Sequence, residues 1–258
     1  MSMVITSLEA LALPVGMAVA AGVVGCFAVM RRMTLASDAI SHVALPGIGI
    51  ALALQINPVL GGIAALLLGT VLVWLIEHKT RVPTEAVIGV VFSAALAIGS
   101  MLTSGEELIE ALFGAQRAPG GAETLLGIGA ASLVIAFILR ARHRLLITLV
   151  SSDLARTTGI DVARLDFLFL IAFALTVALG LRYLGILLMG SLIIIPAATA
   201  RHLTRSLDSM LATAVALALA ATGLGSLGAR VLPFGVGPLT ILVAAAFFIV
   251  SLVWRPSE

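Results

Sequence analysis

The long apolar runs of this chain limit its fold more than any other feature. A helix needs roughly 20 mostly apolar residues to cross about 30 Å of hydrocarbon, and the sequence contains nine uncharged runs near that length. The runs are Leu11–Met30, Ala39–Leu54, Val59–Ile76, Ala86–Leu102, Leu125–Leu139, Phe167–Leu181, Leu184–Ala200, Met210–Leu227 and Leu239–Trp254. Since none of them alternates apolar and polar residues as a strand would, the sequence predicts an all-α, polytopic membrane helix bundle.

The overall composition agrees with this prediction. Hydrophobic residues make up 61% of the 258 positions and charged residues 11%, against about 45–50% and about 25% in soluble proteins. So little polar surface excludes a water-soluble enzyme, a disordered chain and a nucleic-acid binder. We therefore expect one transmembrane domain over residues 1–258 and no nucleic-acid partner.

The number of spans depends on two short runs, Ala39–Leu54 and Leu125–Leu139. Counting both gives nine spans, and reading one of them as a re-entrant piece gives eight. Pro46 and Gly47 are tolerated inside a run only where neighbouring helices satisfy the backbone, which indicates a packed bundle. The first run follows Glu9 and no Lys or Arg, so we expect a span there instead of a cleaved signal peptide.

The basic residues are divided unequally between the two sides of the predicted bundle. If successive loops alternate between the sides, twelve of the 15 Lys and Arg residues fall on one side. They are Arg31, Arg32, Lys79, Arg81, Arg140, Arg142, Arg144, Arg156, Arg164, Arg201, Arg205 and Arg255. Only Arg117, Arg182 and Arg230 fall on the other side. The positive-inside rule makes the first side cytoplasmic, so the N-terminus is outside and the C-terminus inside.

The predicted cytoplasmic loop at about 145–166 contains a short helix signal. Ser152 or Asp153 is a good N-cap, Gly159 is a good helix stop, and Asp161 can cap the next turn. Between cap and stop lie Leu154, Ala155 and Arg156. Two interpretations remain open: a rigid helix to which a partner binds, or an amphipathic elbow on the bilayer surface.

The chain has no nucleotide-binding motif of its own. A P-loop requires a glycine-rich turn followed by a lysine on the phosphates, and the only lysine, Lys79, has no such turn before it. The chain is therefore not expected to be an enzyme or to hold a permanent cofactor. If it moves its cargo at the expense of ATP, a separate subunit must hydrolyse the ATP.

The predicted extracytoplasmic loop after the fourth run is acidic. It carries Glu106, Glu107 and Glu110 against a single basic residue, Arg117. Acidic groups around a mouth raise the local concentration of cations. An ordinary solvated loop explains the same residues equally well.

One pair of ionisable residues stands at the start of an apolar run. Asp38 and His42 are four residues apart, which puts them on one helix face with about 5–6 Å between their Cβ atoms. Carboxylate and imidazole suit Zn²⁺ and Mn²⁺ alike. A second copy of the chain, a water or another span would have to complete the ligand set. The alternative is that Asp38 or Ser37 only caps the helix, with His42 bonded to a backbone carbonyl.

Four motifs follow one another along the chain: Arg31–Gly47 with its Asp-x-x-x-His, Glu85–Ser93, Asp153–Gly159 and Leu192–Arg201. In this order they resemble the permease subunits of bacterial ABC importers for zinc and manganese. One departure is that Phe113-Gly114 is followed by Ala115-Gln116-Arg117, where family members often have an asparagine and a hydrophobic pair. Contacts with a binding protein outside the cell are therefore expected to differ.

The resemblance implies a fold, partners and residue roles. The fold is that of a type II ABC importer permease in the bacterial inner (cytoplasmic) membrane, working as two copies on two cytoplasmic ATPase subunits that bind the ATP. An extracytoplasmic metal-binding protein delivers Zn²⁺ or Mn²⁺. Residues 152–159 become the helix that couples to the ATPase, and Asp38 and His42 match positions associated with metal passage.

Two other functions are compatible with a helical membrane bundle. A permease for siderophores or cobalamin would share the bundle and a similar coupling loop, but His42 and the short chain speak against it. An intramembrane enzyme would need a constellation such as His-Glu-x-x-His within a span, and the sequence has none.

Overall fold

The computed structural model describes residues 2–80, 82–102, 121–180 and 186–253. Every regular element in these ranges is a helix, which confirms the all-α prediction. The helices are α1 (Ser2–Met30), α2 (Thr34–His42), α3 (Ala44–Ala53), α4 (Pro58–Lys79), α5 (Thr84–Leu102), α7 (Gly121–Val150), α8 (Ser152–Thr157), α9 (Val162–Gly180), α10 (Ile186–Leu203), α11 (Leu207–Val231) and α12 (Val236–Val253).

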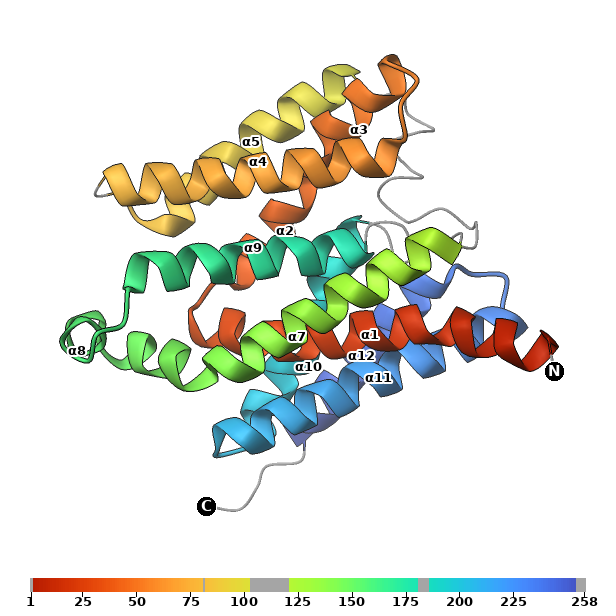
Figure 1. Cartoon of the computed structure of the whole chain (residues 1–258). Coiled ribbons are helices and arrows are strands. Elements are labelled where there is room, and N and C mark those ends of the chain that lie inside the picture. Colours follow the sequence, from red (N-terminus) through yellow and green to blue (C-terminus); the bar gives the residue numbers. More distant parts are fainter. Residues whose placement is uncertain (1, 81, 103–120, 181–185, 254–258) are drawn as a thin grey trace.

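The long helices lie side by side, and α8 is at the end of the bundle opposite the start of α1 (Figure 1). Six of the described helices are long and apolar enough to cross a membrane, and the apolar parts of α2–α3, α5 and α10 are shorter. Helix α1 is the central element: 78% of its apolar stretch is buried, against 22% for α12. The peripheral helices therefore keep apolar side chains on their outer surface, as lipid contact requires.

The second apolar run is divided into two helices, α2 and α3, at Val43. Pro46 has no N–H to donate to the carbonyl of His42, so the regular i→i−4 ladder cannot continue through this position. The residues around the division, Ile40, Val43, Ala44 and Leu45, are all buried. Tertiary packing therefore holds the break in place.

Helices α3 and α4 cross with their backbones in close contact. A Cβ atom built on Gly47 would collide with the carbonyl oxygen of Gly61, and one on Gly61 would collide with that of Gly47. Ala51 and Ala65, one turn further along, also face this crossing. The arrangement is the small-xxx-small packing by which helices approach closely in membranes, and it anchors the element that follows His42.

The fifth run is longer in the structure than its apolar residues suggested. Helix α7 has 30 residues and continues through Arg140, Arg142 and Arg144 to Val150. The expectation of a short fifth span is wrong, because a helix continues past the end of its apolar stretch where basic side chains reach water. The segment 145–166 therefore comprises the end of α7, all of α8 and the start of α9.

Candidate functional site

Helix α2 places Asp38 and His42 one turn apart, as the spacing predicts. The chain leaves α1 through a tight reversal in which Arg32 has a φ of 60° and the Met33 N–H donates to the Ala28 carbonyl over 2.9 Å. Helix α2 then begins at Thr34, with Met33 at its N-cap and no side-chain cap. Asp38 is therefore well inside the helix, so the alternative in which it caps the span does not fit. The side chain of Asp38 lies outside the described part of the structure.

His42 is the last residue of α2 and is half-buried between helices. Its imidazole ring lies 5.4 Å from the ring of Phe92 on α5, centroid to centroid, at an interplanar angle of 54°. The next residue, Val43, packs against Gly69 of α4, where any larger side chain would collide with it. The position of the imidazole is thus determined by α5 and α4 as well as by α2.

One chain does not gather a complete metal site among its described side chains. No group of three His, Cys, Asp or Glu residues in those parts of the chain is close enough to hold an ion. Two ligands on one helix face leave coordination positions of the metal open. A permanent structural site fills all of these positions, whereas a transported ion must bind transiently and leave again. The chain's own arrangement can therefore supply two ligands.

Helix α8 is specified by hydrogen bonds at both of its ends. At its start the Ser151 hydroxyl accepts from the Leu154 N–H over 3.2 Å, so the N-cap is Ser151 and the expected caps Ser152 and Asp153 lie inside the first turn. The reason is that α7 continues to Val150 and leaves one residue between the two helices. Ser151 is then the first residue free to leave helical geometry.

The stop at Gly159 is confirmed. Its φ is +78°, a conformation in which a Cβ atom is unfavourable. Its N–H donates to the Arg156 carbonyl over 3.1 Å, and the Ile160 N–H donates to the Ala155 carbonyl over 3.0 Å, which is the Schellman pattern. Asp161 then accepts from the Arg164 N–H over 3.0 Å at the start of α9, as expected.

The two faces of α8 have different chemistry. Ala155 is completely buried against the bundle, whereas the apolar Leu154 is 52% exposed. Ser152, Asp153 and Arg156 are exposed as well. A partner that covered the Leu154 side chain would remove its apolar surface from water, which favours association.

A cluster around Arg31 was not predicted from the sequence. The Arg31 guanidinium makes an ion pair with Asp166 on α9 at 2.7 Å and donates to the Thr148 hydroxyl on α7 over 3.5 Å. It also lies over the Phe169 ring, 4.6 Å from the centroid. The sequence marks Arg31 as a cytoplasmic charge and as the start of the Arg31–Gly47 motif, but nothing in it pairs Arg31 with residues more than a hundred positions away.

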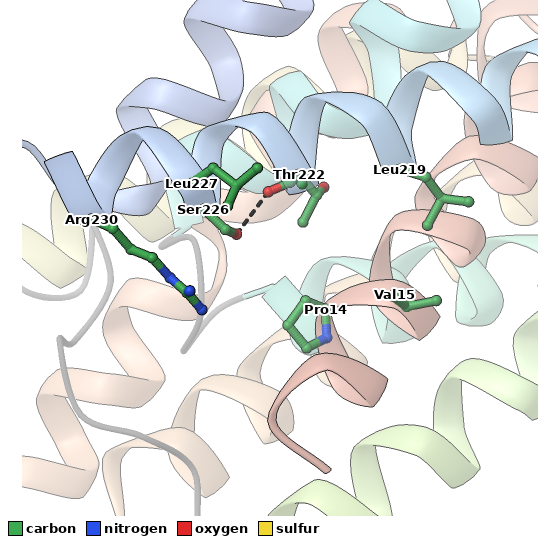
Figure 2. A pocket seen from close by; sticks show the side chains of 8 residues that line it. Pro14, Val15, Leu219, Thr222, Ser226, Leu227 and Arg230 are labelled. Carbon is green, nitrogen blue, oxygen red and sulfur yellow. Dashed lines mark hydrogen bonds between the residues drawn. The ribbon is translucent and has the colours of Figure 1, made fainter. Parts of the chain in front are cut away.

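A cavity of about 360 Å³ lies between α1 and the second half of α11. Arg230, Ser226, Thr222 and Leu219 of α11 line it across from Pro14 and Val15 of α1 (Figure 2). Its described lining contains a guanidinium and no carboxylate, imidazole or thiol. That charge repels divalent cations, so we do not place a metal passage there.

The acidic residues Glu106, Glu107 and Glu110, together with Phe113-Gly114, lie outside the described residues. The expected acidic mouth therefore stays a prediction.

Comparison with known proteins identifies the family. The family model described as ABC 3 transport family matches residues 4–255. The chain belongs to the ABC 3 transport family. This confirms the resemblance that the four motifs indicated, and the match includes α2–α3 and α8 alike.

The relatives of this ABC 3 chain include proteins named as manganese permeases and proteins named as zinc permeases. The manganese import system permease protein ScaB of Streptococcus parasanguinis is 32% identical over 97% of this chain and 91% of its own length. The high-affinity zinc uptake system membrane protein ZnuB of Haemophilus influenzae is 32% identical over 90% of each chain. The solved structure of PsaBC from Streptococcus pneumoniae in complex with Fab matches with a TM-score of 0.82 and 29% identity, covering 96% of this chain and 91% of that one.

Proposed function

We propose that this chain is the permease subunit of an ATP-driven importer that moves Zn²⁺ or Mn²⁺ across the bacterial inner (cytoplasmic) membrane. The observation that carries the proposal is the match over nearly the whole chain to the ABC 3 transport family, with manganese and zinc permeases among the relatives. Chemistry supports it, because α2 offers a carboxylate and an imidazole one turn apart and both suit these metals.

The proposed topology has nine traversals, with α2–α3 together making one of them. The traversals are α1, α2–α3, α4, α5, α7, α9, α10, α11 and α12. In this order α8 lies on the cytoplasmic side, which agrees with the twelve basic residues assigned there and with its place opposite the start of α1 (Figure 1). If the division at Val43 makes α2–α3 re-entrant, the count becomes eight.

The metal passage is proposed to lie between two copies of the chain. A divalent ion must shed water to enter a low-dielectric passage, and fixed ligands must replace that water. Asp38 and His42 supply two ligands, and the same pair of a second copy would raise the number to four, which a two-fold axis permits. Glu106, Glu107 and Glu110 would attract the ion to the outer mouth, where a metal-binding protein delivers it.

Energy is proposed to come from a separate ATPase that docks on α8. Leu154 is the apolar anchor, while Ser151 and Gly159 hold the short helix in shape. The N-cap and the glycine stop keep α8 rigid. A helix that deformed when the ATPase moved would not transmit that movement to α7 and α9. The single lysine of the chain, Lys79, lacks a P-loop context, so the chain alone should not hydrolyse ATP.

Reconstitution tests this function directly. The chain should be purified with the ATPase and binding-protein partners encoded beside it and placed in liposomes, with uptake of radioactive Zn²⁺ and Mn²⁺ measured with and without ATP. ATP-dependent uptake of either free ion supports the proposal. Uptake restricted to a cobalamin or a ferric siderophore would replace it with the alternative function, a chelate importer.

A further inference from the structure

The turn between α1 and α2 is bonded to both helices that flank α8. Arg31 contacts Asp166 near the start of α9 and Thr148 near the end of α7. Helix α8 stands between these two contacts, joined to α7 through Ser151 alone and to α9 through residues 158–161. Because caps hold both connections, a displacement of α8 must reach Thr148 and Asp166.

The Arg31 side chain is held tightly enough to carry that displacement. Its side chain is 14% exposed, against 33% for Asp166, and it rests on the fully buried Phe169 ring. Its Nε is buried without a hydrogen-bond partner among the described residues. Asp166, the Thr148 hydroxyl and the aromatic ring stabilise the guanidinium charge, and a partly buried ion pair of this kind resists separation.

The turn itself is rigid on the other side of Arg31. The N–H groups of Arg31, Arg32 and Met33 donate to carbonyls of the last turn of α1 over 2.9–3.2 Å. Arg201 of α10 donates over 3.2 Å to the same Val29 carbonyl that accepts from the Arg32 N–H. Met33 is buried, and α2 starts with the next residue. Any shift of Arg31 thus moves the start of the helix that carries Asp38 and His42.

We infer that Arg31 is a positioning residue that transmits movement of α8 to α2, so that docking or release of the ATPase repositions the Asp38–His42 pair. The inference rests on the proposed function, because it concerns the coupling of ATP hydrolysis to metal passage. The mechanical link from α8 through Arg31 to α2 can be tested in the isolated chain. Its effect on metal transport can be measured only in the complete transporter.

The chain offers a matched control for the Arg31–Asp166 pair. Arg142 of α7 and Asp208 of α11 form an ion pair of nearly the same length, 2.8 Å. It is more exposed, with 35% and 73% of the two side chains accessible, and it does not involve the α1–α2 turn. Asp166→Asn and Asp208→Asn each remove one negative charge with little change in shape.

Hydrogen exchange on the full chain in detergent tests the link. Substitutions between two coupled sites change their coupling free energy by about 0.5–2 kcal/mol, which corresponds to about a 2- to 30-fold change in the hydrogen-exchange rate. We expect Asp166→Asn to raise exchange by that factor in Thr34–His42 and in residues 151–161 together. Asp208→Asn should leave both segments unchanged. Unaltered exchange in Thr34–His42 of Asp166→Asn would overturn the inference.

Transport by the reconstituted complex tests the consequence. In Asp166→Asn and Arg31→Gln the number of ions moved per ATP hydrolysed should fall about 2- to 30-fold while ATP hydrolysis continues, and Arg31→Lys should restore part of it. A purely structural role would lower uptake and hydrolysis in proportion and leave the ratio constant, which contradicts the inference. If the unaltered complex moves no metal, the proposed function fails, while the exchange measurement still decides the link.

Discussion

Helices α2 and α8 are both short, and each follows a break after a long helix, yet they are specified in different ways. Helix α8 has a serine hydroxyl at its N-cap and a left-handed glycine after its C-cap. Helix α2 has Met33 at its N-cap and no side-chain cap, and it runs into α3 at the buried Val43. The difference shows that the surroundings decide which residues end a helix.

Water explains the contrast. At α8, water competes for the terminal N–H and C=O groups, so side chains with local hydrogen bonds are needed to hold one geometry. Around α2 and α3 neighbouring helices fix the geometry, and the close crossing of Gly47 with Gly61 leaves no room for a larger side chain. Substitutions that test local bonding should therefore affect α8, and those that test packing or metal binding should affect α2–α3.

The largest effect is expected on metal uptake, from substitutions of Asp38 and His42 in α2. Asp38→Asn and His42→Ala should each reduce uptake of Zn²⁺ or Mn²⁺ by about a hundredfold or more, since losing even an indirect partner of a metal ligand costs about 10–100-fold. Membrane protein levels should not change. His143→Ala, at an exposed position of α7, is the control and should transport normally. Near-normal uptake by Asp38→Asn would show that the Asp38 carboxylate is not a metal ligand.

The α3–α4 crossing should be the next most sensitive position, through packing. Gly61→Ala places a Cβ against the carbonyl oxygen of Gly47, and overpacking of this kind costs about 1–3 kcal/mol. Gly129→Ala on α7 meets no atom within 4 Å and should be neutral or slightly stabilising. Thermal unfolding of both variants in the same detergent measures the difference. Equal melting temperatures would show that the α2–α3 region does not depend on this contact.

A substitution on the exposed face of α8 should weaken binding of the ATPase and leave the folding of the chain unchanged. Leu154→Ala should weaken ATPase binding by about tenfold, as truncating an interface anchor costs more than about 1 kcal/mol. Leu126→Ala is the control, because Leu126 is 76% exposed near the opposite end of α7. Binding of the detergent-solubilised variants to immobilised ATPase gives both values. If Leu154→Ala binds as the unaltered chain does, α8 is an elbow on the membrane surface after all.

The smallest effect is expected at the cap of α8. Ser151→Ala removes the hydroxyl that accepts from the Leu154 N–H, a loss of about 0.5–2 kcal/mol. Hydrogen exchange should rise in residues 151–161 and, through the Arg31 contacts, by a smaller factor in α2. Ser151→Asn keeps a capping side chain and should behave like the unaltered chain. A change in α2 as large as that in α8 would remove the distinction between the two regions.

Much of this architecture was readable from neighbouring residues. The apolar runs predicted a helical membrane bundle, and the Asp153–Gly159 segment predicted a short helix with its stop at Gly159, because capping and left-handed glycines act within one turn. The same reasoning misplaced the N-cap by at least one residue, since it did not anticipate that α7 would reach Val150.

The sequence by itself determined that this chain lies in a membrane, which side its charges favour, and where α8 ends, since apolar length, charge and turn chemistry are local properties. Tertiary structure decided where α2 meets α3, how closely Gly47 approaches Gly61, and which groups hold Arg31. Arg31 and Thr148 are 117 positions apart along the chain, and only packing brings them together. Inside a membrane, apolar side chains face lipid and protein alike, so hydropathy alone could not indicate these neighbours.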